Sequence, residues 1–223
     1  MYRVEDKFGC SRKELFRLQG RLQYLLDCDS NESDEQGYKI SSLYFDDLQD
    51  SCLKDTIEGH QSRRKYRIRI YNDSLDLIKL EVKEKHNNRI YKLSKPITKE
   101  EADKLIHGEC IACTYRDDDP ATLFNLAIKQ KGFRPKVIVT YERKAFIYDA
   151  GNVRITLDRN VRASNDIDRF GAKDIVYDFV KENDAVLEVK YDEYMPRFIM
   201  QLLELGNMHQ TAYSKYQLCR ELF

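Results

Sequence analysis

Charged and apolar residues alternate along eight segments of the chain, and this period-2 pattern predicts eight β-strands. Successive side chains in a strand point to opposite faces of the sheet, so the segment 63–71 would carry four basic residues on one face and Tyr66, Ile68 and Ile70 on the other. The eight expected strands are 2–9, 39–46, 63–71, 75–85, 88–95, 135–148, 152–159 and 184–192.

Helix-start signals separate these strands. Ser11-x-x-Glu14 and Thr98-x-x-Glu101 are capping boxes, and Asp119-Pro120 supplies an N-cap with proline at the first helical position. The expected helices are 11–27, 98–107, 119–132, 196–206 and 213–222, with polar loops at 28–37 and 160–174 and hairpin turns at Asn87-Asn88 and Ala150-Gly151-Asn152. No linker rich in Pro, Gly or Ser divides the chain, so residues 1–223 are interpreted as one α+β domain.

The basic row Arg63, Lys65, Arg67 and Arg69 constrains the fold. Same-face neighbours about 6.7 Å apart repel by about 0.6 kcal/mol in bulk water, but by about 2.5 kcal/mol at an effective dielectric near 20. An enclosed face would therefore need an anion or interleaved carboxylates. Eight antiparallel strands are enough to close a barrel, which predicts a tunnel with a charged interior and helices packed outside. The alternative is a barrel whose charged faces are merely solvated.

Composition narrows the choice of partner. The 223 residues include 38 basic and 38 acidic side chains, so bulk charge gives no support for a nucleic-acid partner. The chain shows no apolar run long enough to span a membrane and no export signal, and its six cysteines are interpreted as reduced thiols of a cytoplasmic protein. Cys110-x-x-Cys113 lacks the second ligand pair of a zinc site, and no Gly-rich phosphate loop is present.

The order of several short motifs resembles a known family. Tyr44-Phe45-Asp46, Leu53 and Arg67-Ile68-Arg69 resemble the Y-x-D…L…R-x-R signature of the triphosphate tunnel (CYTH-like) superfamily, and within it the VTC-type polyphosphate polymerase domain. The supporting motifs, in family order, are Leu80-Glu81-Val82-Lys83, Tyr141-Glu142-Arg143, Val153-Arg154-Ile155-Thr156-Leu157-Asp158, Leu187-Glu188-Val189-Lys190 and Tyr213-Ser214-Lys215-Tyr216. The resemblance runs from Lys7 to Lys215 and implies an eight-stranded antiparallel tunnel.

The resemblance also implies most of the site residues, and the charged strand faces add Lys190 and Glu5. The expected catalytic cations are Lys7, Arg67, Arg69, Lys83, Arg143 and Lys215; the expected phosphate-binding residues are Lys92, Tyr141, Lys190 and Ser214; the expected metal ligands are Glu188 and Glu5. Alternation leaves two positions open. Either Lys92 or Lys95 could point inward, and Arg143 shares its face with apolar residues, so a twist or bulge would have to turn it.

Hydrolytic members of the superfamily typically begin with Glu-x-Glu-x-Lys, whereas this chain has Arg3-Val4-Glu5-Asp6-Lys7. The loss of one carboxylate favours a phosphotransferase with a single Mn²⁺ or Mg²⁺ over a two-metal hydrolase. The resemblance therefore implies an enzyme that transfers the γ-phosphate of ATP to inorganic polyphosphate, without a nucleic-acid partner or a transmembrane segment of its own. A triphosphatase and a non-catalytic module that binds polyphosphate or inositol phosphates remain alternatives.

Overall fold

The computed structural model describes residues 4–29, 37–87, 89–180, 184–203 and 208–223. The chain divides into two compact units. Unit 1 comprises residues 1–39, 141–161 and 181–213, and unit 2 comprises residues 40–140, 162–180 and 214–223. Strands β3 (Tyr38–Asp46), β7 (Arg134–Tyr148) and β8 (Val153–Ser164) contribute residues to both units, and each unit is described separately below.

The described residues form an antiparallel sheet with six α-helices, which confirms the predicted α+β class. The eight predicted strands correspond to its eight long strands. Besides β3, β7 and β8, these are β1 (Val4–Ser11), β4 (Ser62–Tyr71), β5 (Ser74–His86), β6 (Arg89–Ile97) and β10 (Asp184–Tyr191). Unit 1 has the hydrogen-bonded order β11-β1-β10-β8-β7, and unit 2 has the order β7-β3-β4-β5-β6. The short strands β2 (Asp27–Cys28), β9 (Asp178–Phe179) and β11 (His209–Gln210) pair with β7, β8 and β1.

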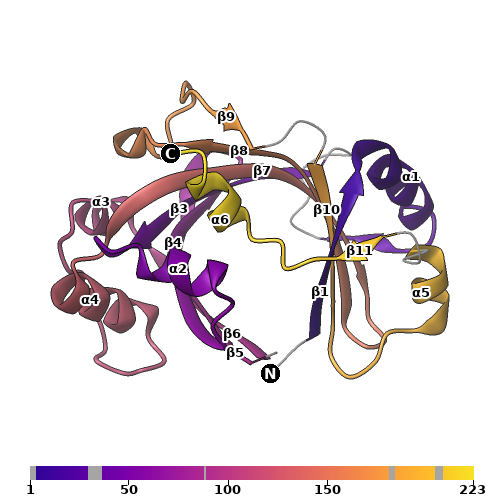
Figure 1. Ribbon diagram of the computed structural model, residues 1–223, viewed down its shortest axis with the longest axis horizontal. Coiled ribbons are helices and arrows are strands. Elements are labelled where there is room, and N and C mark those ends of the chain that lie inside the picture. The colour runs from indigo at the N-terminus through magenta and orange to yellow at the C-terminus, as the bar shows by residue number, and fades with distance from the viewer. Residues whose placement is uncertain (1–3, 30–36, 88, 181–183, 204–207) are drawn as a thin grey trace. The chain divides into compact units, whose positions relative to one another are not determined.

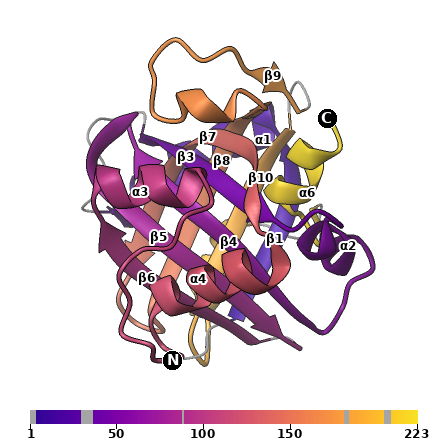
Figure 2. The same ribbon diagram turned by 90° about the vertical axis from the view of Figure 1, so that its left-hand side faces the viewer.

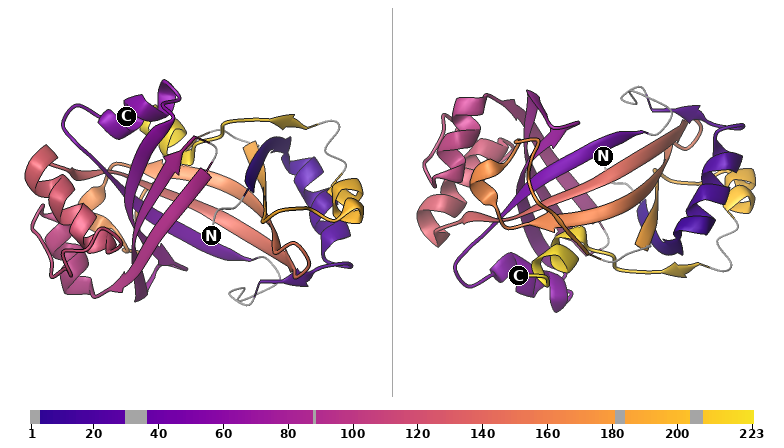
Figure 3. Two further views of the ribbon diagram at one scale, coloured as in Figure 1. Left: turned by 90° about the horizontal axis from the view of Figure 1, so that it is seen from below. Right: turned by 90° about the horizontal axis from the view of Figure 1, so that it is seen from above.

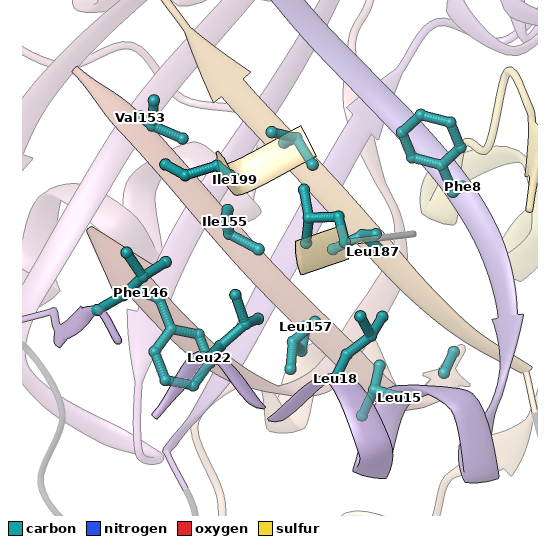
Figure 4. Packing of buried hydrophobic residues seen from close by; sticks show 14 residues of the cluster. Phe8, Leu15, Leu18, Leu22, Phe146, Val153, Ile155, Leu157, Leu187 and Ile199 are labelled. Atoms are coloured by element: carbon teal, nitrogen blue, oxygen red, sulfur yellow. The ribbon is translucent and has the colours of Figure 1, made fainter. Parts of the chain in front are cut away.

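In unit 1, helices α1 (Arg12–Leu22) and α5 (Arg197–Leu203) cover one face of the sheet, and they lie side by side in Figures 1 and 3. Leu15, Leu18 and Leu22 of α1 pack against Leu187 and Ile155 of the strands in a continuous apolar core (Figure 4). The predicted capping box starts α1, with Ser11 N donating to Glu14 Oε2 at 2.8 Å. The charged side chains of these strands are thereby left on the opposite face.

Unit 2 repeats this arrangement with different helices. Helices α3 (Lys99–Ile106) and α4 (Pro120–Lys131) lie across β4, β5 and β6 in Figure 2. Phe124 of α4 packs edge-on against Phe45 and Tyr66, with ring centroids 5.2 Å apart in both pairs. Helices α3 and α4 again cover the apolar face of the strands. Arg67 and Arg69 lie on the opposite face, which α6 (Lys215–Arg220) approaches where Lys65 binds Ser214 and Tyr44 stacks on Tyr216.

Several sequence predictions need correction. Helix α1 ends at Leu22 rather than near 27, and residues 160–164, predicted as loop, extend β8. Helix α2 (Ser51–Ile57) and the 3₁₀ turn η1 (Ile167–Arg169) were not predicted at all. The last helix, α6 (Lys215–Arg220), is shorter than the predicted 213–222. Some predicted features lie outside the described residues. These are the end of the 196–206 helix, Asn88 of the Asn87-Asn88 turn, most of the 28–37 loop, and Arg3.

The turn between β7 and β8 is confirmed, because Gly151 and Asn152 both adopt positive φ, at 79° and 49°. A Cβ at Gly151 would lie 2.4 Å from the Tyr194 carbonyl oxygen, so this close approach requires glycine. No helix in the described part of the chain is both long and apolar enough to cross a membrane.

Candidate functional site: two charged clusters

Glu81 is the centre of the charged cluster in unit 2. Its side chain is fully buried on β5, directly opposite Arg67 of β4 in the antiparallel register. Arg67 approaches Glu81 Oε2 with Nε at 2.7 Å and Nη2 at 2.6 Å, and Arg69 Nη1 lies 3.7 Å from the same oxygen. Lys92 of β6 binds the other carboxylate oxygen at 3.2 Å. One carboxylate therefore holds three cations from β4 and β6, the two strands beside β5, on the face opposite α3 and α4.

Two hydroxyl groups of β3 complete this arrangement. Arg67 Nη1 donates to the Tyr44 hydroxyl at 2.9 Å, and Arg69 Nε donates to Ser42 Oγ at 3.1 Å. Both pairs are direct cross-strand neighbours in the β3–β4 register. Each guanidinium group thus contacts a hydroxyl of β3 on one side and the Glu81 carboxylate of β5 on the other. These contacts fix the orientation of its planar set of N–H donors.

The charges in this cluster stabilise one another. Burial alone would raise the pKa of Glu81, but Arg67, Arg69 and Lys92 outweigh it and hold that pKa well below its ordinary value. Burial lowers the pKa of Lys92, and the carboxylate of Glu81 opposes this shift. Because the folded-state pKa of Glu81 is depressed, the stability that it contributes is present above its unfolded pKa and is lost only as the pH falls through the folded value.

The two lysines that alternation left open have different partners in the structure. Lys92 belongs to the Glu81 cluster, whereas Lys95 Nζ lies 3.6 Å from the carboxylate of Asp119, the N-cap residue of α4. Lys95 therefore lies at the start of α4, and Lys92 is the one of the two that lies beside Arg67 and Arg69.

A row of lysines crosses the same face one step along the strands. Lys65 of β4 is directly opposite Lys83 of β5, which is directly opposite Lys92 of β6. Like charges in directly opposed positions destabilise a sheet, and a bound anion relieves that repulsion. Lys65 Nζ also donates to Ser214 Oγ at 2.8 Å, so the predicted residue Ser214 lies beside this row, with Lys215 following it as the first residue of α6.

Asp46 has a structural role that the family signature did not suggest. Its Oδ1 accepts the backbone N–H groups of Asp47 and Cys52, both at 2.9 Å. Its Oδ2 accepts Leu53 N–H at 3.1 Å and the Tyr216 hydroxyl at 2.7 Å. The fully buried carboxylate therefore caps α2 and attaches α6 to it, and burial next to this carboxylate raises the pKa of Tyr216.

Asp46→Asn is expected to lower the free energy of unfolding by about 2–4 kcal/mol, because an amide NH₂ cannot accept hydrogen bonds from the donors that face one of the two oxygens. Urea denaturation measures the loss. Asp47→Asn is the matched control: Asp47 accepts from Gln49 and Ser51 through Oδ1 alone, so an asparagine retains the acceptor. Equal losses in the two variants would contradict a special role for Asp46.

The charged cluster in unit 1 alternates in sign. Glu5 of β1 is opposite Lys190 of β10, and Lys7 is opposite Glu188. Lys7 Nζ lies 3.1 Å from Glu5 and 3.8 Å from Glu188, while Lys190 Nζ lies 3.5 Å from Glu5 and 2.5 Å from Glu188. Each carboxylate side chain is 7% exposed. Two lysines thus hold two carboxylates next to each other on the face away from α1 and α5.

Arg143 makes a buried, bidentate ion pair in unit 1. Its Nε and Nη2 bind the two oxygens of Asp158 at 2.6 and 2.7 Å, and its guanidinium lies 5.3 Å from the centre of the Tyr141 ring. Burial alone would lower the pKa of Arg143, but the carboxylate of Asp158 outweighs burial and raises that pKa above its ordinary value. Arg143 is thereby turned to the charged side despite its apolar neighbours on β7.

The predicted residues fall equally into the two units. Unit 1 holds Glu5, Lys7, Tyr141, Arg143, Glu188 and Lys190, and unit 2 holds Arg67, Arg69, Lys83, Lys92, Ser214 and Lys215. The partners that orient them are Ser42, Tyr44, Lys65, Glu81 and Asp158; the sequence analysis named all but Ser42 in its motifs or basic row, but assigned none of them this role. Thr156, named in the motif of 153–158, is a direct neighbour of Glu188, and its buried hydroxyl has no hydrogen-bond partner among the described residues. Only cross-strand register identifies these partners, and register was not predicted.

Comparison with solved structures shows that this chain shares its fold with several proteins of low sequence identity. HpAC1 from Hippeastrum, whose structure is described as revealing a dominant triphosphatase activity, superposes with a TM-score of 0.56 at 13% identity over 99% of this chain and 96% of its own. A Bacillus halodurans protein proposed to be an adenylate cyclase gives a TM-score of 0.55 at 14% identity, covering 95% and 94% of the two chains. The PH1819 protein of Pyrococcus horikoshii gives a TM-score of 0.52 at 15% identity over 100% of both chains.

The family model of the VTC domain matches residues 2–223, so the chain belongs to the VTC domain family. A search among curated proteins finds no match to this sequence.

Proposed function

We propose that this protein is a metal-dependent polyphosphate polymerase, which transfers the γ-phosphate of ATP to the end of a growing inorganic polyphosphate chain. The observation that carries the proposal is the Glu81 cluster, in which two arginines and a lysine are held in fixed orientations on the face of the strands opposite α3 and α4. Membership of the VTC domain family supports the same assignment.

The chemistry asks the protein mainly to position phosphates and to neutralise charge. Arg67 and Arg69 would bind oxygens of the triphosphate through their guanidinium forks, with Lys83 and Lys92 beside them. Lys7, Lys190, Arg143 and Lys215 would stabilise the charge that develops during transfer, and the hydroxyls of Tyr141 and Ser214 would donate hydrogen bonds. The attacking group is a terminal phosphate oxygen that is already anionic, so the reaction needs no general base.

The residues of unit 1 fit a divalent cation. Glu188 and Glu5 offer adjacent carboxylates, and hard cations such as Mg²⁺ and Mn²⁺ commonly bind one or two carboxylates together with substrate phosphates. The described residues contain no group of three or more His, Cys, Asp or Glu side chains at metal-binding distance, so phosphate oxygens and water would supply the other ligands. The cation would neutralise phosphate charge, while Lys7 and Lys190 hold the carboxylates in place.

Incubation of the purified protein with ATP and Mn²⁺, followed by gel electrophoresis of the products, tests the proposal. A ladder of long phosphate chains is the expected result. Orthophosphate without a ladder would show a triphosphatase, in keeping with the activity described for HpAC1. Binding of tripolyphosphate without turnover would show a sensor, and the absence of both binding and thermal stabilisation would exclude a phosphate ligand.

Glu188→Gln is expected to reduce Mn²⁺-dependent turnover about a hundredfold, the size typical of losing one electrostatic contact to the reacting group. Tripolyphosphate binding in metal-free buffer should be unchanged or tighter, because a negative charge beside Lys7 and Lys190 is removed. Glu193→Gln, at an exposed position after β10, is the matched control. Equal turnover in wild type and Glu188→Gln at subsaturating Mn²⁺ would exclude Glu188 as a metal ligand.

A further inference from the structure

The two helices of unit 1 bury one face each and leave the other face exposed. Helices α1 and α5 lie side by side (Figure 3), and their inner faces pack on the apolar core through Leu15, Leu18 and Leu22 of α1 and Ile199 and Leu203 of α5. Their outward faces point away from this core, and we call them together the α1–α5 surface.

Aromatic and basic side chains share the outward face of α1. This face is a stripe formed by Lys13, Phe16, Arg17, Gly20 and, in the turn after the helix, Tyr24. The side chains of Phe16 and Tyr24 are 74% and 83% exposed, and both basic side chains are exposed as well. A Cβ built at Gly20 would meet no described atom within 4 Å, so the middle of the stripe is open. Exposed apolar side chains that gather on one face typically mark a binding surface.

Helix α5 extends the α1–α5 surface with the same kinds of residue. Its first residue, Arg197, is exposed, and Phe198 and Met200 are 42% and 44% exposed. The ring of Phe198 is held in place by an edge-on contact with Tyr148, with ring centroids 5.2 Å apart. Basic and large apolar side chains therefore occur together on both helices.

The charge of the α1–α5 surface is one-sided. The two helices carry five basic residues and one acidic residue, a net charge of +4, whereas the whole chain has 38 residues of each sign. The acidic residue, Glu14, accepts hydrogen bonds from Ser11 N at 2.8 Å and Ser11 Oγ at 2.7 Å. These bonds, with a smaller contribution from the charge of Arg17, lower the pKa of Glu14. The one carboxylate of the two helices thus serves the helix cap. The basic residues are Arg12, Lys13, Arg17, Arg21 and Arg197.

We propose that the α1–α5 surface binds an anionic lipid bilayer, with Lys13, Arg17 and Arg197 at the headgroup phosphates and the rings of Phe16 and Tyr24 inserted between the headgroups. Such a bilayer attracts basic residues electrostatically and accepts aromatic rings at its interface, so it accounts for both kinds of side chain. A soluble anion would account for the basic residues alone. The core of a protein–protein interface is depleted of charged residues, whereas here basic and aromatic residues interleave along one stripe.

Co-sedimentation of the purified protein with lipid vesicles tests this proposal, independently of any catalytic activity. The wild-type protein should bind vesicles made of equal parts of phosphatidylglycerol and phosphatidylcholine, and should bind phosphatidylcholine vesicles about tenfold more weakly or less. In Lys13→Gln/Arg17→Gln, the partition coefficient onto the anionic vesicles should fall about thirtyfold, the effect of two basic residues near an anionic surface. In Phe16→Ala it should fall about tenfold, the lower end of the effect of withdrawing a phenylalanine ring from an apolar environment.

Exposed positions of unit 2 provide matched controls. Lys99→Gln/Lys104→Gln on α3 removes the same charge, and Leu126→Ala on α4 removes an exposed apolar side chain, so both should bind the anionic vesicles as wild type does. All of these variants change exposed side chains, so each should keep its melting temperature within about 2 °C of wild type.

Four results would overturn the proposal: no binding of the wild-type protein to the anionic vesicles, equal binding to the neutral ones, an equal loss in the unit 2 controls, or unchanged binding in Phe16→Ala. A parallel titration with soluble polyglutamate separates the competing partner. If the wild-type protein bound polyglutamate and not the vesicles, and Lys13→Gln/Arg17→Gln lost that binding, the α1–α5 surface would instead be assigned to an acidic protein.

Discussion

Arg67→Ala is expected to reduce polyphosphate synthesis from ATP about a hundredfold to a thousandfold, the range seen when one oriented donor to a developing charge is removed. Arg67 carries the most direct contacts of the unit 2 cluster, with two nitrogens on Glu81 and a third on the Tyr44 hydroxyl. Its position in the centre of the basic face makes it the donor with the largest expected share of triphosphate binding. Initial rates at saturating ATP and Mn²⁺, with tripolyphosphate affinity measured in parallel, give the effect.

The fold must be monitored in the same experiment, because Arg67→Ala also removes the principal counter-ion of a buried carboxylate. Arg67→Lys separates the two roles: it keeps the positive charge beside Glu81 but loses the bidentate geometry, so it should fold normally and still lose most turnover. Arg64→Ala is the matched control, because Arg64 lies on the opposite face of β4 and pairs with the partly exposed Glu84 at 3.2 Å. Full activity in Arg67→Lys would contradict oriented phosphate recognition, and aggregation of Arg67→Ala alone would assign the residue a structural role.

The strands were predictable because their signal is local. Alternation in 63–71 needs no knowledge of the rest of the chain, and the same holds for the capping boxes that begin α1 and α3. These signals placed all eight long strands and put the basic and apolar residues of 63–71 on the correct faces, but they did not predict the orientation of Arg143 or choose between Lys92 and Lys95. They also predicted that helices would cover the apolar faces, which holds within each unit.

The unpredicted features depend on contacts between distant segments. Helix α2 has no capping side chain at its own N-cap, Asp50, because Asp46 supplies the acceptor from the end of β3. The partner of Arg143 is Asp158, on another strand, and the choice between Lys92 and Lys95 depends on which one reaches Glu81. Register and long-range hydrogen bonds decide these features, and a single sequence does not encode them in any local pattern.

The family signature also gains a physical meaning from these contacts. In Tyr44-Phe45-Asp46, Tyr44 accepts a hydrogen bond from Arg67, Phe45 packs against Phe124, and Asp46 caps α2 at Cys52 and Leu53. Three consecutive residues thus serve the charged face, the apolar core and the helix that follows. The motif therefore mainly fixes the shape of the charged face and of the helix next to it.

Arg143→Met is expected to lower the free energy of unfolding by about 3–5 kcal/mol, the cost of leaving a buried charge without its partner. The reason is Asp158, whose side chain is fully buried and bound through both oxygens at 2.6 and 2.7 Å. For a chain of this length the loss corresponds to a fall in melting temperature of about 10 °C. Urea denaturation in phosphate-free buffer measures it without interference from a bound anion.

A surface pair on the same two strands provides the comparison. Arg159 of β8 binds Glu142 of β7 at 3.0 Å, but both side chains are partly exposed, so Arg159→Met should cost less than about 1 kcal/mol. The double variant Arg143→Met/Asp158→Asn should recover a large part of the loss, because it removes both members of the buried pair. If Arg143→Met cost no more than Arg159→Met, Asp158 would have to be protonated or hydrated in the folded protein, and Arg143 would be held for its substrate alone.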